Sequence, residues 1–358
     1  MKTKSNRSRL ARRAGAALIC AVQFFRPKWF LAAVCMVLAG SGAIARHANA
    51  QDNAQWSALL REDLRVAAIG DSLLKANADL CRNTMPVTGM VLHSADQYGS
   101  GSMQARFANG PIAISTIVSG SSSAVAGLRP DDAIIAINGH PTDALAAPLQ
   151  GNLREAAFAL LASQPVGGPI SMRIARGGSE QEFILNPPAG CHSLIEIRVE
   201  SGPRARSDGQ IIQIQYAFAG QLDDQQVAIV IAHELAHSVL EHRRRKEEAG
   251  IDNGLFAAVG KNRQANRRAE IEADRLSAHL LANAGYDPAL VPAFWRSDIG
   301  KDIGGVLLES GIYPSHEARA QMVEREIALY LPQRRGPTWP GHLLVLRDRG
   351  FAPPDSSD

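Results

Sequence analysis

A His-Glu-x-x-His motif at residues 233–237 limits the structure and chemistry open to this chain more than any other segment. Most of the residues around it, within 227–242, are apolar, which predicts a helix buried on nearly every side. His233 and His237 are four positions apart, so both imidazoles point to one place on such a helix. Two imidazoles paired in this way bind Zn²⁺, and Glu234 is placed to act on a water at the metal. Buried histidines need partners, which argues against two solvated side chains on a surface helix.

A second pair of acidic residues downstream supplies a candidate third ligand. Glu270 and Asp274 are also four positions apart and therefore face the same side of a predicted helix. Catalytic zinc sites use three protein ligands and leave the fourth position to water. Glu270 would complete a set with His233 and His237, and Asp274 would accept a hydrogen bond from the second ring nitrogen of a ligand histidine. Glu272 competes for the ligand role, but it lies about 200° around the helix from Glu270, so only one of them can face the metal.

The two motifs together resemble those of the gluzincin zinc peptidases that include HtpX, BepA and the CAAX prenyl proteases. The resemblance is carried by residues 233–237, 270–274 and 280–288, and it covers about residues 207–330. It implies one Zn²⁺ with the ligands His233, His237 and Glu270, the general base Glu234 and the supporting carboxylate Asp274. It also implies that the strand just before the motif helix, here residues 209–216, forms the edge of the active site, where an extended substrate can pair with it.

One segment departs from the pattern of this family. Members often carry a His-Pro-Ser…Arg segment after the third ligand, and the corresponding residues here are Tyr313, Pro314, Ser315 and Arg319. Tyr313 is a candidate phenol donor to the developing oxyanion, and His316 is an alternative for the missing histidine. A loop tyrosine that only packs on its neighbours is an equally open interpretation. Arg319 is expected to act as a structural or substrate-orienting cation.

A separate module upstream resembles a PDZ domain. Residues 124–141 follow the family pattern A-G-L-x-x-G-D-x-I-x-x-(I/V)-N-G, with Asp131 in place of the usual glycine. The predicted elements are a strand at 112–118, a helix at 153–162 and a closing hairpin within 170–185, in a module of about residues 85–190. PDZ domains commonly bind a peptide as an added strand, often with its C-terminal carboxylate held by backbone N–H groups. The loops at 98–101 and 107–110 are both candidates for that role, and a spacer or a lid over the active site remains an alternative function.

The first 50 residues have a charge pattern of their own. They hold nine of the 38 Lys and Arg side chains and none of the 35 Asp and Glu, so the remainder has 29 basic against 35 acidic groups and a net charge of −6. The net charge of +3 for the whole chain therefore gives no indication of nucleic-acid binding. A basic start, an apolar run at 29–45 and the sequence Ala48-Asn49-Ala50 predict a signal peptide cleaved after Ala50.

The expected location is a bacterial periplasm, and the alternative is an inner-membrane anchor formed by an uncleaved N-terminal segment. No later segment reaches the roughly 18 apolar residues that cross a bilayer, so membrane contact is expected to be peripheral at most. Cys81 and Cys191 lie outside the leader. An even number of cysteines in an oxidising compartment predicts one disulfide, although two buried free thiols are the alternative. The bond would join the two ends of the predicted PDZ module.

These features predict an α+β chain with a mainly helical metallopeptidase domain, a small active-site sheet and a β-rich PDZ domain. The expected order is a signal peptide at 1–50, a helical segment at 51–84, the PDZ-like domain at 85–190, the zinc peptidase domain at 191–335 and a C-terminal tail at 336–358. The predicted function is zinc-dependent hydrolysis of peptide bonds in exported proteins, in protein quality control. Its partners would be protein or peptide substrates and a C-terminal peptide ligand of the PDZ module. The alternative is a peptide-binding or chaperone-like adaptor with a structural or latent zinc site, but such a site has no use for Glu234.

Overall fold

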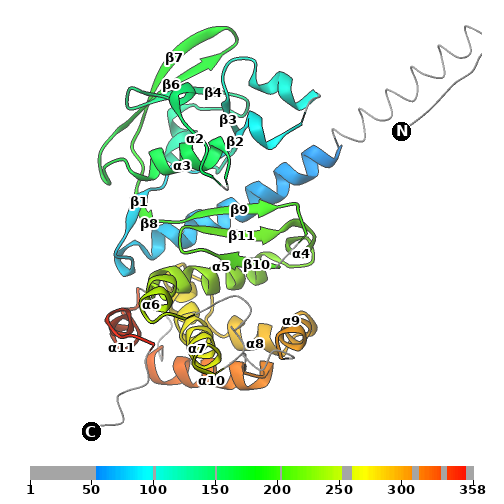
Figure 1. Ribbon diagram of the computed structural model, residues 1–358, viewed down its shortest axis with the longest axis vertical. Helices are drawn as coiled ribbons and strands as arrows, with labels where there is room; N and C mark the ends of the chain where they lie inside the picture. The colour runs from blue at the N-terminus through cyan, green and yellow to red at the C-terminus, as the bar shows by residue number, and fades with distance from the viewer. Residues whose placement is uncertain are drawn as a thin grey trace, which may run out of the picture. The chain divides into compact units, whose positions relative to one another are not determined.

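A computed structural model describes most of the chain (Figure 1). The described residues are 54–99, 102–149, 151–201, 204–251, 260–308, 314–331 and 337–351. The predicted signal peptide, Tyr313 and residues 352–358 lie outside them. The fold class is α+β, as predicted, and Trp56–Asp358 is one compact unit. Within the described residues, no helix combines the length and the apolar character needed to cross a membrane.

A long helix over residues 54–76 begins the described chain. Gly70 suggests a break because glycine is a poor helix former, yet the helix runs through it. The reason is close packing on strand β9 (Leu194–Arg198), since a Cβ atom added to Gly70 would lie 2.5 Å from Cδ1 of Ile195. The 3-10 helix η1 (Ala78–Leu80) follows. The glycine therefore serves contact between helix and strand and does not end the helix.

A disulfide and a short sheet join the two ends of the segment that follows. Cys81 is bonded to Cys191, with 5.4 Å between their Cα atoms. Next to the bond, β1 (Thr84–Pro86) pairs antiparallel with β8 (Ala189–Cys191). The predicted disulfide is present, and the chain enters and leaves the intervening segment at the same place.

The segment between β1 and β8 folds around a six-stranded antiparallel sheet. Its strands are β2 (Met90–Ser94), β3 (Ile112–Ile117), β4 (Ala133–Ile137), β5 (His140–Pro141), β6 (Ile170–Arg176) and β7 (Ser179–Leu185). Its helices are η2 (Ala95–Gln97), η3 (Ser102–Phe107), α2 (Ser122–Ala126), η4 (Thr142–Ala144) and α3 (Leu153–Ala162). The strand order is β2-β3-β4-β6-β7, with β5 paired to β4, which leaves β2 at an edge.

Asp131 occupies the position at which the family pattern has glycine. Its backbone is left-handed, with φ of 66°. This conformation favours glycine, and aspartate tolerates it better than most other residues. The Asp131 carboxylate also accepts a 2.6 Å hydrogen bond from Nη1 of Arg106. The departure from the pattern therefore keeps the turn and costs some backbone strain.

Helix α3 packs into two cores. Ala157 and Leu161 belong to the core of the six-stranded sheet. Ala162 belongs to the larger core formed by the rest of the chain, and Phe158 packs against that same core. Neighbouring sides of this one helix, about 100° apart, thus contact the two parts of the molecule.

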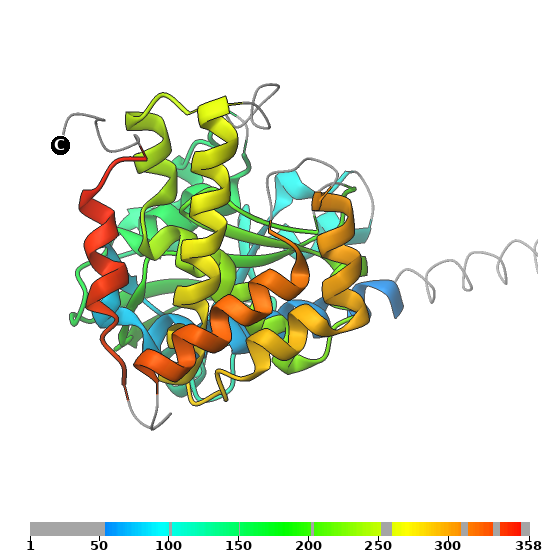
Figure 2. The same ribbon diagram turned by 90° about the horizontal axis from the view of Figure 1, so that it is seen from below.

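The remainder forms a three-stranded sheet and a set of helices. The strand order is β10 (Ala205–Ser207), β11 (Ile211–Gln215), β9, with β11 parallel to β9 and antiparallel to β10. The helices are α4 (Tyr216–Ala219), α5 (Asp224–Val239), α6 (His242–Glu248), α7 (Gly260–Asn283), α8 (Leu290–Arg296), α9 (Asp298–Leu308), α10 (His316–Tyr330), α11 (Gly341–Leu344) and η5 (Val345–Asp348). Helices α5 to α10 gather on one side of the sheet (Figure 1), and α7 packs beside α10 (Figure 2).

The edge of this sheet differs from the expectation. The strand predicted at 209–216 forms as β11, but it is the central strand. The edge next to α5 is β10, a three-residue strand at Ala205–Ser207. The prediction was wrong because such a short strand has too few residues to show an alternating pattern.

Candidate metal site

Helices α5 and α7 bring the two sequence motifs together. His233 Nε2 lies 3.2 Å from Glu270 Oε2 and 3.3 Å from His237 Nε2. The distance from His237 Nε2 to Glu270 Oε1 is 3.5 Å. The three side chains are half-buried, and each offers one atom to a common point. The structure thus places the three predicted ligands in one group.

The spacing of these atoms fits a tetrahedral zinc ion. Zinc bonds of about 2.0–2.1 Å to nitrogen and oxygen, arranged tetrahedrally, separate neighbouring ligand atoms by about 3.3–3.4 Å. The two imidazole nitrogens are 3.3 Å apart, and the nearest Glu270 oxygens are 3.2 Å from His233 (Oε2) and 3.5 Å from His237 (Oε1), so all three separations lie close to that value. The donor set, two imidazoles and one carboxylate, is that of catalytic zinc sites with an open fourth position. The residues therefore fit Zn²⁺.

A second group with the same residue types has a different geometry. Nε2 of His279 and Nε2 of His342 both approach a single oxygen, Oε1 of Glu326, at 3.0 and 2.6 Å. The other oxygen of Glu326 accepts a 2.7 Å bond from Nε of Arg275. A ligand pair around zinc would stand about 3.3 Å apart, so this group is a hydrogen-bonded cluster. It holds α11 against α7 and α10.

Asp274 and Arg319 support the first ligand. Nδ1 of His233 lies 3.1 Å from Oδ1 of Asp274. Arg319 donates from Nε and Nη2 to both oxygens of that carboxylate, at 2.5 and 2.6 Å, and its guanidinium lies 3.5 Å from the ring centroid of Trp295. Burial alone would raise the pKa of Asp274. Arg319 and His233 outweigh this effect and hold the pKa of Asp274 below its usual range. A charged carboxylate at this point fixes the ring of His233 with Nε2 toward Glu270.

His242 supports the second ligand in a way that the sequence reasoning missed. Its Nδ1 lies 2.8 Å from Nδ1 of His237, and its Nε2 lies 3.1 Å from Oε2 of Glu272. Burial lowers the pKa of both histidines, which keeps them neutral. A proton on Nδ1 of His237 is then donated to His242, whose Nε2–H is donated to Glu272. This arrangement leaves a lone pair on Nε2 of His237 for a metal.

The chain turn at Glu241 creates this support. Helix α5 gives way to α6 at Glu241, whose backbone is left-handed with φ of 53°. The turn brings His242 back toward α7. The residues after it, 243–248, read as a solvated charge run in the sequence, yet Arg245 is only 2% exposed and donates a 2.7 Å bond to Glu272. Glu272, the predicted competitor for the metal, is thus held by the buried pair His242 and Arg245.

The electrostatics of the group favour a cation. Burial disfavours a proton on His233, but hydrogen bonds to Asp274 and Glu270 outweigh it and raise the pKa of His233 to about 10. Burial also raises the pKa of Glu270, but His237, His233 and Arg319 together bring it well below its usual range. The two carboxylates therefore stabilise positive charge on the His233 ring that lies between them, and a divalent ion at Nε2 of His233 would take the place of that proton beside Glu270. The neighbouring Glu234 differs, because burial raises its pKa to about 7.

A cleft of about 880 Å³ opens in front of these residues. Strand β10 forms one wall together with the turn after it, and Phe294 and Trp295 of α8 line another part. The volume lies at the upper end of the usual range for ligand sites, about 300–1,000 Å³. Strand β10 is an edge of its sheet, and in the described residues no further strand pairs with its outer side. An extended chain in the cleft can therefore pair with it.

The remaining sequence candidates have different positions. Tyr313 lies outside the described residues, so its role stays a prediction. His316 is the first residue of α10 and is not one of the described residues that converge on the common point. Arg319 lines the cleft, with Nη2 3.9 Å from Oε2 of Glu270. Its bidentate bond to Asp274 makes it a structural cation first.

Comparison with known proteins adds evidence for both parts. The PDZ domain family matches residues 89–149. The chain contains a PDZ domain. The chain is also similar to the mitochondrial metalloendopeptidase OMA1 of Arabidopsis thaliana. The two sequences are 29% identical in a match that covers 32% of this chain and 28% of that relative. This chain therefore spans less than a third of the relative's length, and a distant homologue is a metalloendopeptidase.

Two solved structures resemble a part of the chain. The HtrA-type protease AlgW with a decapeptide is 17% identical, covers 30% of each chain and has a TM-score of 0.22. The HtrA3 PDZ domain bound to a phage-derived ligand is 16% identical and covers 30% of this chain and 88% of that one, also with a TM-score of 0.22. Neither structure describes the chain as a whole.

The groove of the PDZ domain lies between β2 and α3. Neither loop expected to hold a carboxylate lines it: residues 107–110 lead into β3, and of residues 98–101 only the first two are described. The turn that enters β2 lines it instead, with Thr88 and Gly89 at its start and a left-handed φ of 73° at Gly89. The role of these two loops in holding a carboxylate stays a prediction.

Proposed function

We propose that this protein is a zinc metalloendopeptidase of the gluzincin type found in HtpX and BepA, acting on exported proteins in quality control. The observation that supports it most is the spacing of His233, His237 and Glu270, which matches the ligand separation of a tetrahedral zinc ion. Glu234 beside them and the free edge of β10 supply the two further needs of peptide hydrolysis, a base and a surface that aligns an extended chain.

The residues of the site have separable roles. A divalent ion held by the three ligands would polarise the scissile carbonyl and acidify a water. Glu234 would take the proton of that water and later deliver it to the leaving amine. Burial raises the pKa of Glu234 to about 7, and a cation bound beside it would lower that value. Strand β10 positions the substrate backbone, and Asp274 and His242 hold the ligand rings.

The decisive variant is Glu234→Gln, which keeps the shape of the side chain and removes the base. We expect it to retain one zinc per chain and to lose at least a hundredfold in the cleavage of labelled casein, within the range of about 10²–10⁴ for general base catalysis. Zinc content is measured by atomic emission and cleavage by fluorescence. Glu248→Gln, an exposed carboxylate on α6 outside the cleft, is the matched control.

The same measurements test the alternative, a peptide-binding adaptor with a structural zinc site. In that case purified protein binds peptides but shows no cleavage that a chelator removes. Cleavage by Glu234→Gln at the parental rate would refute the assignment of the base. The predicted export to a periplasm is part of the proposal and is tested by fractionation of cells that produce the full chain.

A further inference from the structure

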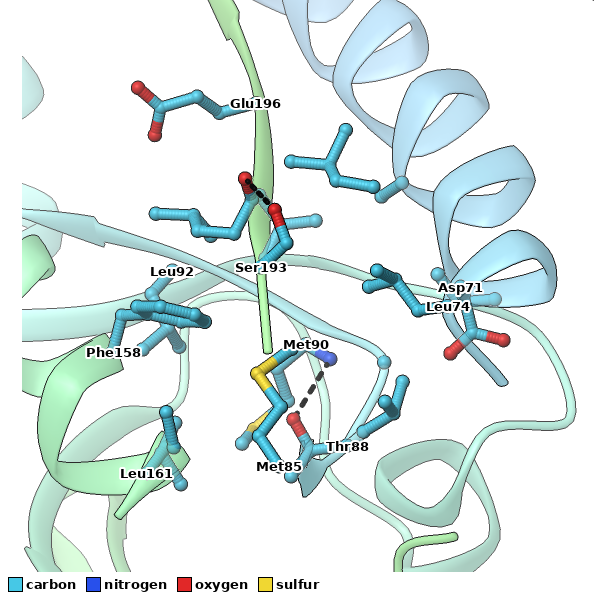
Figure 3. Close-up of a pocket in the computed structure, with 18 of the residues that line it drawn as sticks. Asp71, Leu74, Met85, Thr88, Met90, Leu92, Phe158, Leu161, Ser193 and Glu196 are labelled. Carbon is cyan, nitrogen blue, oxygen red and sulfur yellow. Dashed lines mark hydrogen bonds between the residues drawn. The ribbon is translucent and has the colours of Figure 1, made fainter. Parts of the chain in front are cut away.

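The metal cleft differs in charge from the pocket beside the PDZ domain. Apolar side chains, such as Leu92 and Phe158, form most of the lining of the pocket beside the PDZ domain (Figure 3). The lining of the metal cleft includes five basic and four acidic side chains: Arg204, Arg206, Arg243, Lys246, Arg319, Asp208, Glu234, Glu247 and Glu270. The basic groups outnumber the acidic ones even before a divalent cation binds. An acidic segment of a substrate therefore suits this cleft better than a basic one.

Lys246 is the basic side chain of this lining that has no acceptor among the described residues. It is half-buried. Burial lowers the pKa of Lys246, and the charge of Glu270 opposes this effect. Each arginine of the lining, in contrast, donates to an acceptor of the chain at 2.5–2.9 Å: Arg204 to Asp302, Arg206 to Gln213, Arg243 to Glu247 and Arg319 to Asp274. An ammonium that is partly removed from water needs a partner, which a ligand in the cleft can supply.

Helix α6 closes the end of the cleft at which β10 stops. Nη1 of Arg243 donates a 2.9 Å bond to the backbone oxygen of Asp208, the residue that follows β10. A Cβ atom added to Gly209 would lie 3.8 Å from the side chain of Arg243, so this turn packs against α6. Lys246 is three positions after Arg243 and four after His242, and it shares their side of α6. A substrate that pairs with β10 therefore meets Lys246 at this end.

The start of α6 places this end of the cleft next to the metal ligands. Nδ1 of His242 lies 2.8 Å from Nδ1 of the ligand His237. Lys246 is four residues, or about 6 Å, farther along α6, and it lines the cleft together with Glu270. Successive residues of an extended chain are about 3.3 Å apart. The ammonium of Lys246 is thus within reach of a substrate residue close to the scissile bond.

The turn after β10 favours a side-chain carboxylate over a C-terminal one. Proteins usually capture a terminal carboxylate with several backbone N–H groups of one turn. Three N–H groups of this turn already donate to side chains at 2.7–3.1 Å, those of Gly209 to Ser207 and of Gln210 and Ile211 to Asp208. The ammonium on α6 is left as a single point charge, which suits the side chain of a substrate that continues through the cleft.

We propose that Lys246 selects substrates with an aspartate or glutamate close to the scissile bond, on the side of that bond that faces the turn after β10. The ammonium donates to the side-chain carboxylate, and each charge gains a partner as the substrate excludes water. An uncharged side chain at the same position leaves the ammonium buried and unpaired, so it binds less tightly. This inference rests on the proposed peptidase function and assigns its substrates to the class of acidic peptides.

The first test measures binding without cleavage, on the full protein carrying Glu234→Gln. The probes are fluorescent peptides with both ends blocked, in which one glutamate is placed at each position of a neutral sequence in turn, and each has a partner with glutamine at that position. By anisotropy, we expect glutamate to bind about tenfold more tightly than glutamine at one or two neighbouring positions. Lys246→Met, which keeps the aliphatic stem, should abolish this preference, and Lys246→Glu should reverse it. Lys301→Met, at an exposed lysine of α9 outside the cleft, is the control.

Two results of this test would overturn the proposal. The first is a glutamate preference that is as large in Lys246→Met as in the parent. The second comes from a peptide without acidic side chains, compared with a free and with an amidated C-terminus. A preference for the free terminus that Lys246→Met removes would assign the ammonium to the end of the chain and not to a side chain.

The second test measures selection during cleavage. Casein fragments made by the parent and identified by mass spectrometry should carry Asp or Glu at one position near the cut about fivefold more often than casein composition predicts. Lys246→Met should lose this enrichment while retaining one zinc per chain, and Lys246→Arg, which keeps the charge, should preserve it. Equal enrichment in Lys246→Met and the parent overturns the proposal. Full activity of Glu234→Gln would refute the peptidase assignment instead and leave the binding preference standing.

Discussion

Replacing Asp63 with asparagine should make the protein more stable at high pH. Asp63 lies on the helix at 54–76, and its Oδ1 accepts a 3.3 Å hydrogen bond from the backbone N–H of Ile197 on β9. Burial raises the pKa of Asp63 to about 7, although that hydrogen bond and Arg154 act in the opposite direction. A carboxylate that holds its proton this strongly in the folded state is destabilising once it ionises. An asparagine keeps the acceptor oxygen and never ionises.

The sign and size follow from the two pKa values. The folded chain holds the proton up to about pH 7, whereas the unfolded chain releases it near 3.8. The proton on Asp63 stabilises the folded state fully below about pH 4. This contribution to the free energy of unfolding falls by about 1.4 kcal/mol per pH unit as the pH rises, and it is lost above about pH 7. Three pH units correspond to about 4 kcal/mol. Between pH 4.5 and 8, the advantage of Asp63→Asn should grow by about 3 kcal/mol.

Urea unfolding at the two pH values, without reductant, measures this difference. Asp79→Asn, an exposed aspartate just after the same helix, is the control and should show no such trend. A free energy of unfolding for Asp63→Asn that tracks the parent across the whole range would refute the reasoning. It would mean that the carboxylate is solvated or paired in the folded protein and carries no burial cost.

Three further variants test other parts of the structure. His242→Phe removes the hydrogen-bond partner of His237 and should weaken zinc binding by about 10- to 100-fold in competition with a chelator; unchanged affinity would show that His242 does not orient the ligand. Gly70→Ala should lower the free energy of unfolding, because its Cβ would lie 2.5 Å from Ile195, and the cost should exceed the usual gain from alanine in a helix, about 1 kcal/mol. Replacing Cys81 and Cys191 together with serine opens a loop with a sequence separation of 110 and should cost about 2–5 kcal/mol in urea unfolding; a loss below 1 kcal/mol would contradict this.

Local spacing explains which parts of the site are predictable from the sequence. His233, His237, Glu270 and Asp274 form two i,i+4 pairs, and helix geometry alone places each pair on one face. The PDZ elements follow in the same way from alternating strands and turn residues, and the helix at 153–162 has the predicted bounds. These inferences need no knowledge of how distant segments meet.

Other parts depend on contacts that the sequence does not encode locally. His242 reaches His237 only because Glu241 adopts a left-handed backbone, which nothing in the sequence around it predicts. The hydrogen bonds that link Glu196, Gln213 and Arg206 depend on the register of three strands, and a shift of one residue would turn those side chains to opposite faces. Gly70 resembles a helix breaker until the strand beneath it is known. The charge run after His242 was misjudged because its buried partner, Glu272, comes from a different helix.

The dual packing of α3 has a consequence for how this protein can be divided. A fragment that ends at the edges of the PDZ domain would carry Phe158 and Ala162 into water, and the part left behind would lose an apolar surface that those residues cover. Neither half would keep the core that it has in the intact chain. The PDZ domain is therefore not an independent module. Before it could be fused to another enzyme, Phe158 and Ala162 of α3 would have to be replaced with polar residues.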